Sequence, residues 1–570
     1  MPRCEAARSA PFRPPRRTDS TGMRRGRRMF VLGALAAVFP AAVAPGCRRD
    51  ERPRESAKAL ERKPERPAEL AAELVVPRAA EAWTALRPLL GAIGSFFAVG
   101  PELSLSSVFG MGPLAAGAFD LTRPVVGGLV VAQGEPSLVL VAPVVSGAEL
   151  VARLTTGAAP THRAVRRGEL VLLEADGERA EARSIAVVDD VVLMGPPPAL
   201  ALAGPYLGRV LARAPASGPP VLVLRGAALR ERIVPVLRGV WRARREKLAQ
   251  GARSLREARG RPADFAEPEA LLAAADSAVG VALSVLESAR EARLELIAEK
   301  DHARFELRVL GARLEEVARF LPPGPEGARE LITELPASAL LSLRTRRSAE
   351  GASAGLPPLV RELLGDRLAP ATARAVDSTW SALDRARGSE QALALLEDGT
   401  VMWTGTVVDP RALRAAITEA VRHAARSPFI DPFTARLGRV LGVREESKAS
   451  ADGSPVDRFR LRFAGKPPET NSTTIDVTAR VDAERFTVVL EAANGASAPS
   501  SEDPTRASLL RALDPARALV SIVDLAALGL APRGAPAPAA FALGSSGDEV
   551  RLTMALSPRA SAALTRGLLE

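Results

Sequence analysis

Cysteine, histidine and aromatic residues are scarce in this sequence. Among 570 residues there are two cysteines, three histidines and one tyrosine, and aromatic residues make up 4% of the chain. Cys4 and Cys47 both lie near the N-terminus, so the chain beyond residue 47 has no thiol for a disulfide or a thiolate metal site. Its core has to be built from Ala, Leu and Val, and its length gives room for two domains or more.

The scarcity of histidine and tryptophan restricts the chemistry further. His162, His302 and His423 are far apart and form no HExxH or His-x-His motif, so no metal site and no cofactor are predicted. His302 follows Lys300 and Asp301 and is expected to be an exposed turn residue. Sugar sites generally need aromatic stacking platforms, and the four tryptophans fit core or helix packing better.

The charge of the chain is concentrated at its N-terminus. The net charge is +11, but residues 1–69 hold 17 Arg and Lys against 8 Asp and Glu, a surplus of +9. The remaining 501 residues are left with +2. The body therefore lacks the basic excess that is typical of nucleic-acid-binding proteins, and no nucleic-acid partner is predicted.

Residues 24–47 have the three parts of a secretory signal peptide: a basic start, an apolar stretch and a small-residue end. Arg27-Arg28-Met29-Phe30 resembles the twin-arginine export motif, in which paired arginines precede bulky apolar residues. The apolar run over 29–39 is too short to span a bilayer, and Pro40 interrupts it. We therefore predict export and not a transmembrane helix.

The end of this segment, Ala44-Pro45-Gly46-Cys47, resembles the site cut by lipoprotein signal peptidase, after which Cys47 receives lipid. Pro45 departs from the usual pattern, and plain secretion with Cys47 as a lone thiol is the alternative. Residues 1–47 are thus expected to be a signal peptide, with Met23 as the alternative start. Residues 48–69 alternate Arg, Glu, Lys and Pro as a solvated tether does. The mature protein is expected in the cell envelope, lipid-anchored or periplasmic.

Beyond the tether, the apolar pattern predicts alternating helices and hairpins. A helical segment is expected over 68–98. β-Branched runs predict a hairpin over 125–145 with a helix after it, and a second hairpin over 185–194. A helical insertion over 227–290 precedes a third hairpin over 293–309.

The same order recurs in the second half of the chain. A hairpin over 392–408 leads into a helix with Asp409 as its N-cap and Pro410 at its first position, and another hairpin covers 474–490. This recurrence predicts an α+β fold with an internal repeat. We expect two related units, 70–330 and 331–570, each an antiparallel sheet packed with helices on one face.

One motif suggests a hydrolase. Gly351-Ala-Ser353-Ala-Gly355 has the Gly-x-Ser-x-Gly pattern of a nucleophile elbow, and Asp377 and His423 follow in the order of an α/β-hydrolase. That elbow requires a strand before the serine and a helix after it. Here a polar segment precedes Ser353 and Pro357-Pro358 follows, which favours a surface loop.

Two further segments have both a functional and a structural interpretation. Gly110-x-Gly112-x-x-Ala115 faintly resembles a dinucleotide-binding motif, but tightly paired strands follow it and not a βαβ unit, so a loop with a short helix is favoured. Residues 238–259 form a basic helix that is able to lie on anionic lipid. Its apolar stripe is weak, which favours a solvated helix face or the arm of a helical hairpin.

These features together predict a non-catalytic envelope lipoprotein that binds a protein or an apolar ligand such as a lipid. Residues 115–124, Ala-Ala-Gly-Ala-Phe-Asp-Leu-Thr-Arg-Pro, resemble a segment of uncharacterised exported bacterial proteins, and this resemblance implies no activity. An exported hydrolase using dispersed carboxylates or Ser353 is the second hypothesis. A structural envelope spacer is the third.

Overall fold

The fold is described from a computed structural model of the chain. It describes residues 64–87, 100–132, 135–156, 161–168, 170–175, 184–215, 217–259, 268–299, 301–312, 331–346, 370–396, 398–426, 440–449, 455–463, 473–492, 504–513, 519–526, 531 and 535–569. Every structural statement below concerns these residues.

The strands fall into two sets of ten along the chain. The first set is β1 (Leu70–Val76), β2 (Val125–Ala132), β3 (Glu135–Pro143), β4 (His162–Arg167), β5 (Leu170–Ala175), β6 (Ser184–Val188), β7 (Val191–Gly195), β8 (Val221–Arg225), β9 (Glu291–Ala298) and β10 (Ala303–Leu310). The second set is β11 (Leu341–Arg346), β12 (Arg387–Leu395), β13 (Val401–Val407), β14 (Val440–Ala449), β15 (Pro455–Phe463), β16 (Thr473–Val481), β17 (Arg485–Ala492), β18 (Leu519–Asp524), β19 (Pro538–Ser546) and β20 (Glu549–Leu556).

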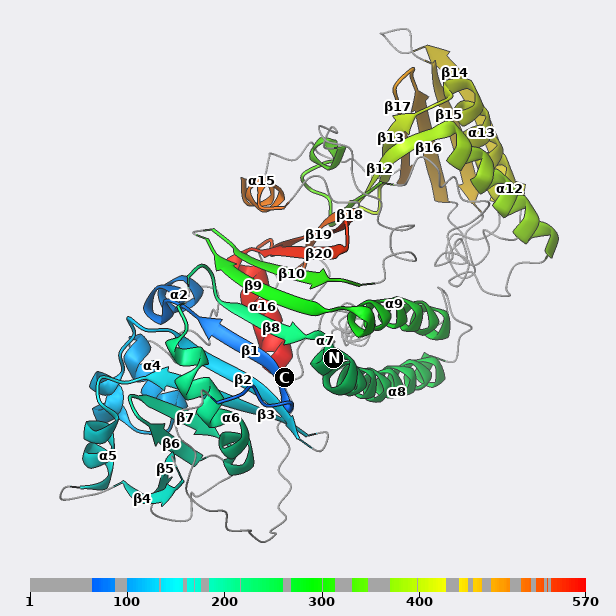
Figure 1. Cartoon of the computed structure of the whole chain (residues 1–570). Coiled ribbons are helices and arrows are strands. Elements are labelled where there is room, and N and C mark those ends of the chain that lie inside the picture. The colour runs from blue at the N-terminus through cyan, green and yellow to red at the C-terminus, as the bar shows by residue number, and fades with distance from the viewer. Residues whose placement is uncertain are drawn as a thin grey trace, which may run out of the picture.

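All of these described strands join one antiparallel sheet of 20 strands (Figure 1). Their order across the sheet is β4-β5-β6-β7-β3-β2-β1-β8-β9-β10-β20-β19-β18-β11-β12-β13-β17-β16-β15-β14. β10 and β20 pair at the middle, from Ala303 opposite Leu556 to Leu310 opposite Glu549.

The helices among the described residues lie between these strands along the chain, except α16, which follows β20. They are α2 (Ala79–Leu86), α4 (Pro101–Val108), η2 (Pro113–Ala118), α5 (Gly147–Thr155), α6 (Pro197–Arg209), η3 (Leu211–Arg213), α7 (Gly226–Ala228), η4 (Leu229–Ile233), α8 (Val234–Arg259), α9 (Pro268–Ser288), η5 (Leu331–Glu334), α12 (Pro370–Ala386), α13 (Pro410–Arg426), α15 (Pro504–Arg511) and α16 (Pro558–Leu569). Here η marks short 3-10 helices, except η4, which is a π-helical turn.

Because side chains alternate between the faces of a strand, the register divides the sheet into a front and a back face. We call front the face that carries Glu306 and its cross-strand neighbours Glu295 and Thr553. The back face carries Leu307 and its neighbours Leu294 and Leu552. The residue pairings between neighbouring strands extend this assignment across the whole sheet, from β4 to β14.

Helices cover two regions of the front face. In the first half, α6 packs Leu200 and Leu207 onto β2, β3, β6 and β7. In the second half, α15 and η5 pack Leu509 and Leu331 onto β12, β18, β19 and β20. Between these regions lie β8, β9 and β10, where α2 contacts β9 and α15 contacts the adjoining β20.

The back face is covered along its length. α4, η2 and α5 pack on the first-half strands, the insertion α7 to α9 and then α16 pack near the β10–β20 pair, and α12 and α13 lie along β13 to β17 (Figure 1). These helices bury apolar side chains against the sheet, except α8, which packs on α9 and η4. The core is therefore a set of separate clusters on the two sides of one sheet.

Several predicted elements are confirmed. The hairpins over 125–145, 185–194, 293–309, 392–408 and 474–490 correspond to β2–β3, β6–β7, β9–β10, β12–β13 and β16–β17, and the insertion corresponds to α7 through α9. Asp409 caps α13, since Ala412 N donates to Asp409 Oδ1 at 2.9 Å. The short helix η2 follows Gly112 (φ 75°), and the strands after it pair in antiparallel fashion, as expected for a segment that is not a dinucleotide motif.

Other predictions are wrong. Residues 70–76 form the strand β1 and not the start of a helix over 68–98, because Leu70 and its neighbours are held between β2 and β8. The two halves share one sheet and do not form separate sheets, since β10 pairs with β20. Helices lie on both faces and not on one, because both faces of most strands carry apolar side chains.

Candidate functional site

Most residues singled out from the sequence lie outside the described part of the chain. Arg27, Arg28, Phe30, Cys47 and Ser353 are all in this group. Of the two hydrolase-order partners of Ser353, Asp377 lies on α12 and His423 on α13. His423 is half exposed, and its Nε2 lies 3.2 Å from Glu419 Oε1 one turn earlier on the same helix.

The three histidines lie on unrelated elements. His162, on β4, is buried with its Nδ1 3.0 Å from Thr161 Oγ1. His302, in the β9–β10 turn, is 4% exposed, so its prediction as an exposed turn residue is wrong; the turn folds the ring inward, where Nε2 lies 3.5 Å from Glu299 Oε2. Within the described ranges, no group of three His, Cys, Asp or Glu side chains is placed to hold a metal ion.

Two of the tryptophans, Trp241 and Trp403, act in packing. Trp241 on α8 donates its Nε1 hydrogen to Asp276 Oδ1 on α9 at 2.8 Å. Trp403 on β13 packs edge-on against Phe486, with ring centroids 4.7 Å apart. Neither ring forms an open platform for a sugar.

One cavity of about 320 Å³ lies between α2 and the ends of β8 and β9. It is lined by Ala82, Pro219 and Ile297 together with Arg78 and Glu81. The last two pair at 3.0 Å and are mostly exposed. The volume is at the low end for ligand pockets, and an exposed ion pair at its rim gives no support for an enclosed apolar ligand.

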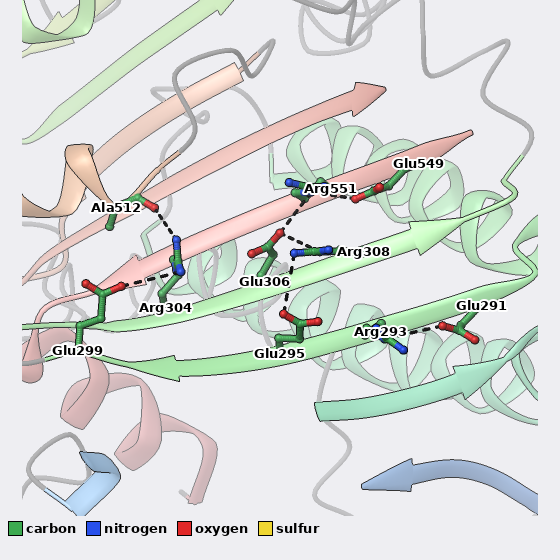
Figure 2. Close-up of polar contacts among 10 residues, drawn as sticks. All are labelled: Glu291, Arg293, Glu295, Glu299, Arg304, Glu306, Arg308, Ala512, Glu549 and Arg551. Carbon is green, nitrogen blue, oxygen red and sulfur yellow. Dashed lines mark hydrogen bonds and ion pairs between the residues drawn. The ribbon is translucent and has the colours of Figure 1, made fainter. Parts of the chain in front are cut away.

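A strip of arginine and glutamate side chains crosses the front face between its two helix-covered regions (Figure 2). We call it the central charged strip; its members are Arg225, Glu291, Arg293, Glu295, Arg304, Glu306, Arg308, Glu549 and Arg551. Arg293, Arg308 and Arg551 stand opposite one another on β9, β10 and β20 and form a row across the sheet. Glutamates flank this row two residues away on both sides.

Ion pairs along and between the strands hold the row together. Like charges that face each other across a strand pair repel, so Arg308 and Arg551 depend on the glutamates beside them. Arg308 Nε donates to Glu306 Oε1 at 2.9 Å, and Arg551 Nε lies 3.2 Å from the same oxygen. Arg551 Nε also donates to Glu549 Oε1 at 2.8 Å. The network therefore bridges β10 and β20, the pair that joins the two halves.

Burial falls off from the centre of the strip to its edge. The Glu306 side chain is 9% exposed, Arg308 is 34% exposed and Arg293 is 44% exposed. Each glutamate of the strip faces a guanidinium, and no member of the strip is a serine, cysteine or histidine. The strip is thus suited to recognising charged groups, whereas nucleophilic or acid–base catalysis requires a nucleophile or a free carboxyl.

A second group of charges on the front face is buried in β11 and β12. Arg344 has no exposed surface, and Arg346 and Glu390 are each 6% exposed. Glu390 Oε1 lies 3.6 Å from Arg344 Nη1 and 3.7 Å from Arg346 Nη2. Burial raises the pKa of Glu390, and the two guanidiniums oppose this rise. We interpret this cluster as part of the packing, because buried charges persist in proteins when they are paired.

The central charged strip was not identified from the sequence. Its signal was present: charged and apolar residues alternate along 291–295, 304–308 and 549–553, which predicts strands with one polar face. The missing information was the pairing of β10 with β20, which brings Arg308 opposite Arg551 although they are far apart in sequence.

Comparison with protein-family models, with curated proteins and with solved structures gave no match to this chain. Among the helices of the described residues, none combines the length and apolarity needed to cross a bilayer.

Proposed function

We propose that this protein is an exported envelope lipoprotein, tethered to a membrane through lipid on Cys47, that acts by binding a partner protein and not by catalysis. The observation that carries the proposal is the central charged strip, a region of the sheet where both signs of charge are arranged in rows and the arginines remain partly exposed. The proposed signal peptide, Arg27-Arg28-Met29-Phe30 with Cys47, accounts for the export and the anchor.

We further propose that the body consists of two related α+β units, as the recurring sequence pattern predicts. Strand order supports this. Read outward from the middle, the first ten strands follow the order 10, 9, 8, 1, 2, 3, 7, 6, 5, 4, and the second ten follow the same order with ten added to each number. α6 and α15 occupy corresponding places, as do α5 and α13. The central charged strip then lies at the junction of the units.

The mixed charge of the strip favours a protein over other partners. A row of three arginines lies between glutamates on both sides, within 4 Å of them. An anionic lipid surface offers one sign of charge and an apolar ligand offers none, whereas a folded protein surface carries both. Electrostatic complementarity of this kind contributes specificity and association rate more than raw affinity.

Site-specific photo-cross-linking in the native envelope tests this proposal. A photoreactive residue replacing Arg225, a member of the strip that is 53% exposed, should form an adduct with one protein of defined mass. A second substitution, Arg293→Glu, should weaken that adduct by about tenfold, because reversing one interfacial charge typically costs more than 1 kcal/mol. The control position is Arg153 on α5, on the back face and 47% exposed, which should give no such adduct.

Equal adducts from positions 225 and 153, or an adduct indifferent to Arg293→Glu, would reject the strip as the binding surface. The anchor is tested separately. The mass of the protein purified from its own envelope should include acyl chains on Cys47, and an unmodified N-terminal cysteine or a different first residue would reject the lipoprotein assignment.

A further inference from the structure

The outer strands of the second half carry a second uncovered surface with a different charge. We define the arginine face as the front-face basic residues of three neighbouring strands: Arg444 and Lys448 on β14, Arg458, Arg460 and Arg462 on β15, and Arg480 on β16. Two acidic side chains of the same strands share this surface, Glu446 and Asp476. Six basic and two acidic groups leave a surplus of +4, although the whole chain beyond residue 69 has only +2.

The two sides of these strands are built differently. On the back, α12 and α13 cover Phe459 and Phe486, and Asp457 accepts hydrogen bonds from Arg414 of α13. On the front, the uncharged positions of these strands are Gly442, Val456, Thr474 and Thr478, with Val456 as the one sizeable apolar side chain. In the first half, the corresponding strands β5 and β6 instead place Leu170, Leu172, Ala186 and Val188 in the apolar cluster that includes α6. The arginine face therefore has no apolar footprint for a missing helix, and its occupant must be polar.

The cations of this face are only partly neutralised. Arg460 forms two bonds to Asp476, at 2.8 and 2.9 Å, and Arg444 pairs with Glu446 at 3.0 Å. Arg458 and Arg462 are exposed and form no ion pair with the described residues. Their guanidiniums are thus available, and a guanidinium binds phosphate through two parallel hydrogen bonds.

We infer that the arginine face docks onto an anionic phospholipid surface. Aromatic rings are absent from the described residues of this face, so a single-stranded nucleic acid would have no stacking platform. The choice of a membrane over an acidic protein rests on the proposed lipid anchor. A tether over 48–69 spans at most about 75 Å, so the proposed anchor would hold the body near a membrane and raise the effective concentration of phospholipid headgroups.

The test uses the full-length chain with Cys47→Ser, so that no acyl group contributes to binding. It should co-sediment with vesicles of phosphatidylcholine and phosphatidylglycerol, and not with phosphatidylcholine alone, and added salt should release it. The double variant Arg458→Glu/Arg462→Glu should lower partitioning by roughly tenfold or more, because each cation near an anionic surface contributes several-fold. Arg458→Gln/Arg462→Gln, a milder change, should give a smaller loss.

The matched control is Arg242→Glu/Arg244→Glu on α8, two other exposed arginines, which should change partitioning by no more than about twofold. An equal loss in this control would move the contact to the basic helix α8 and overturn the inference. Absence of vesicle binding would also overturn it, and patch-dependent cross-linking to an acidic protein would then identify the alternative occupant. Acylation of Cys47 is measured independently, so failure here leaves the proposed anchor standing.

Discussion

Glu306 is the residue on which the junction between the two halves should depend most. Its carboxylate is 9% exposed and lies between Arg308, at 2.9 Å, and Arg551, at 3.2 Å. Replacing it by glutamine keeps the shape of the side chain and removes the charge. Arg308 and Arg551 then face each other across β10 and β20 with one negative charge fewer to offset their repulsion.

The size of this effect follows from the burial of the partners. A hydrogen bond to a charged group contributes about 1.5–3 kcal/mol. The arginines are 34% and 28% exposed, so water screens part of their interaction, and the glutamine oxygen still accepts one hydrogen bond. We expect Glu306→Gln to destabilise the β10–β20 pair by about 1–2 kcal/mol.

Hydrogen exchange measured by mass spectrometry isolates this effect, because it reports local opening strand by strand. Peptides from β10 and β20 should exchange roughly 5–30 times faster in Glu306→Gln, and peptides from β4 and β5 should be unchanged. Glu549→Gln is the matched control: Glu549 also binds Arg551, at 2.8 Å, but is 19% exposed and lies at the end of β20, so its effect should be smaller. Exchange in β10 and β20 within about twofold of wild type, or an equal increase in Glu549→Gln, would refute the reasoning.

Two other positions give predictions of different kinds. Gly147→Ala places a Cβ 1.9 Å from Asp189 O and should destabilise the chain by about 3 kcal/mol in a denaturant titration. The control Gly117→Ala, with open space around its Cβ, should be nearly neutral. Similar unfolding midpoints for the two variants would contradict the packing of α5 on the sheet. Hydrogen bonding from Arg414 lowers the pKa of Asp457. The ionised carboxylate therefore stabilises the folded state fully above the ordinary aspartate pKa of about 3.9, and this stabilisation is lost as the pH falls through the lowered pKa of the folded state. Asp457→Asn should therefore lower the melting temperature at pH 6 and lose most of that effect at pH 2, and an equal effect at both pH values would contradict this.

The local elements were predictable wherever the residues themselves decide the backbone. Asp409 and Pro410 begin α13 because an N-cap acceptor and a fixed proline φ favour a helix start. The hairpins β2–β3 and β16–β17 follow from β-branched runs and turns between them. β1 was missed because Leu70–Val76 is a short apolar run whose pattern does not separate a strand from a buried helix; its hydrogen bonds go to β2 and β8.

By itself, the sequence determined five of the hairpins, the start of α13, the recurrence of the hairpin order and the neutrality of the body after the N-terminus. The tertiary structure decided which polar faces meet. Arg308 and Arg551 share the central charged strip because β10 pairs with β20, and six basic residues form the arginine face because β14, β15 and β16 align in register. A strand pattern specifies which side chains share a face of that strand. Which strand lies beside it depends on the burial of apolar surface over the whole chain, and no local pattern carries that information.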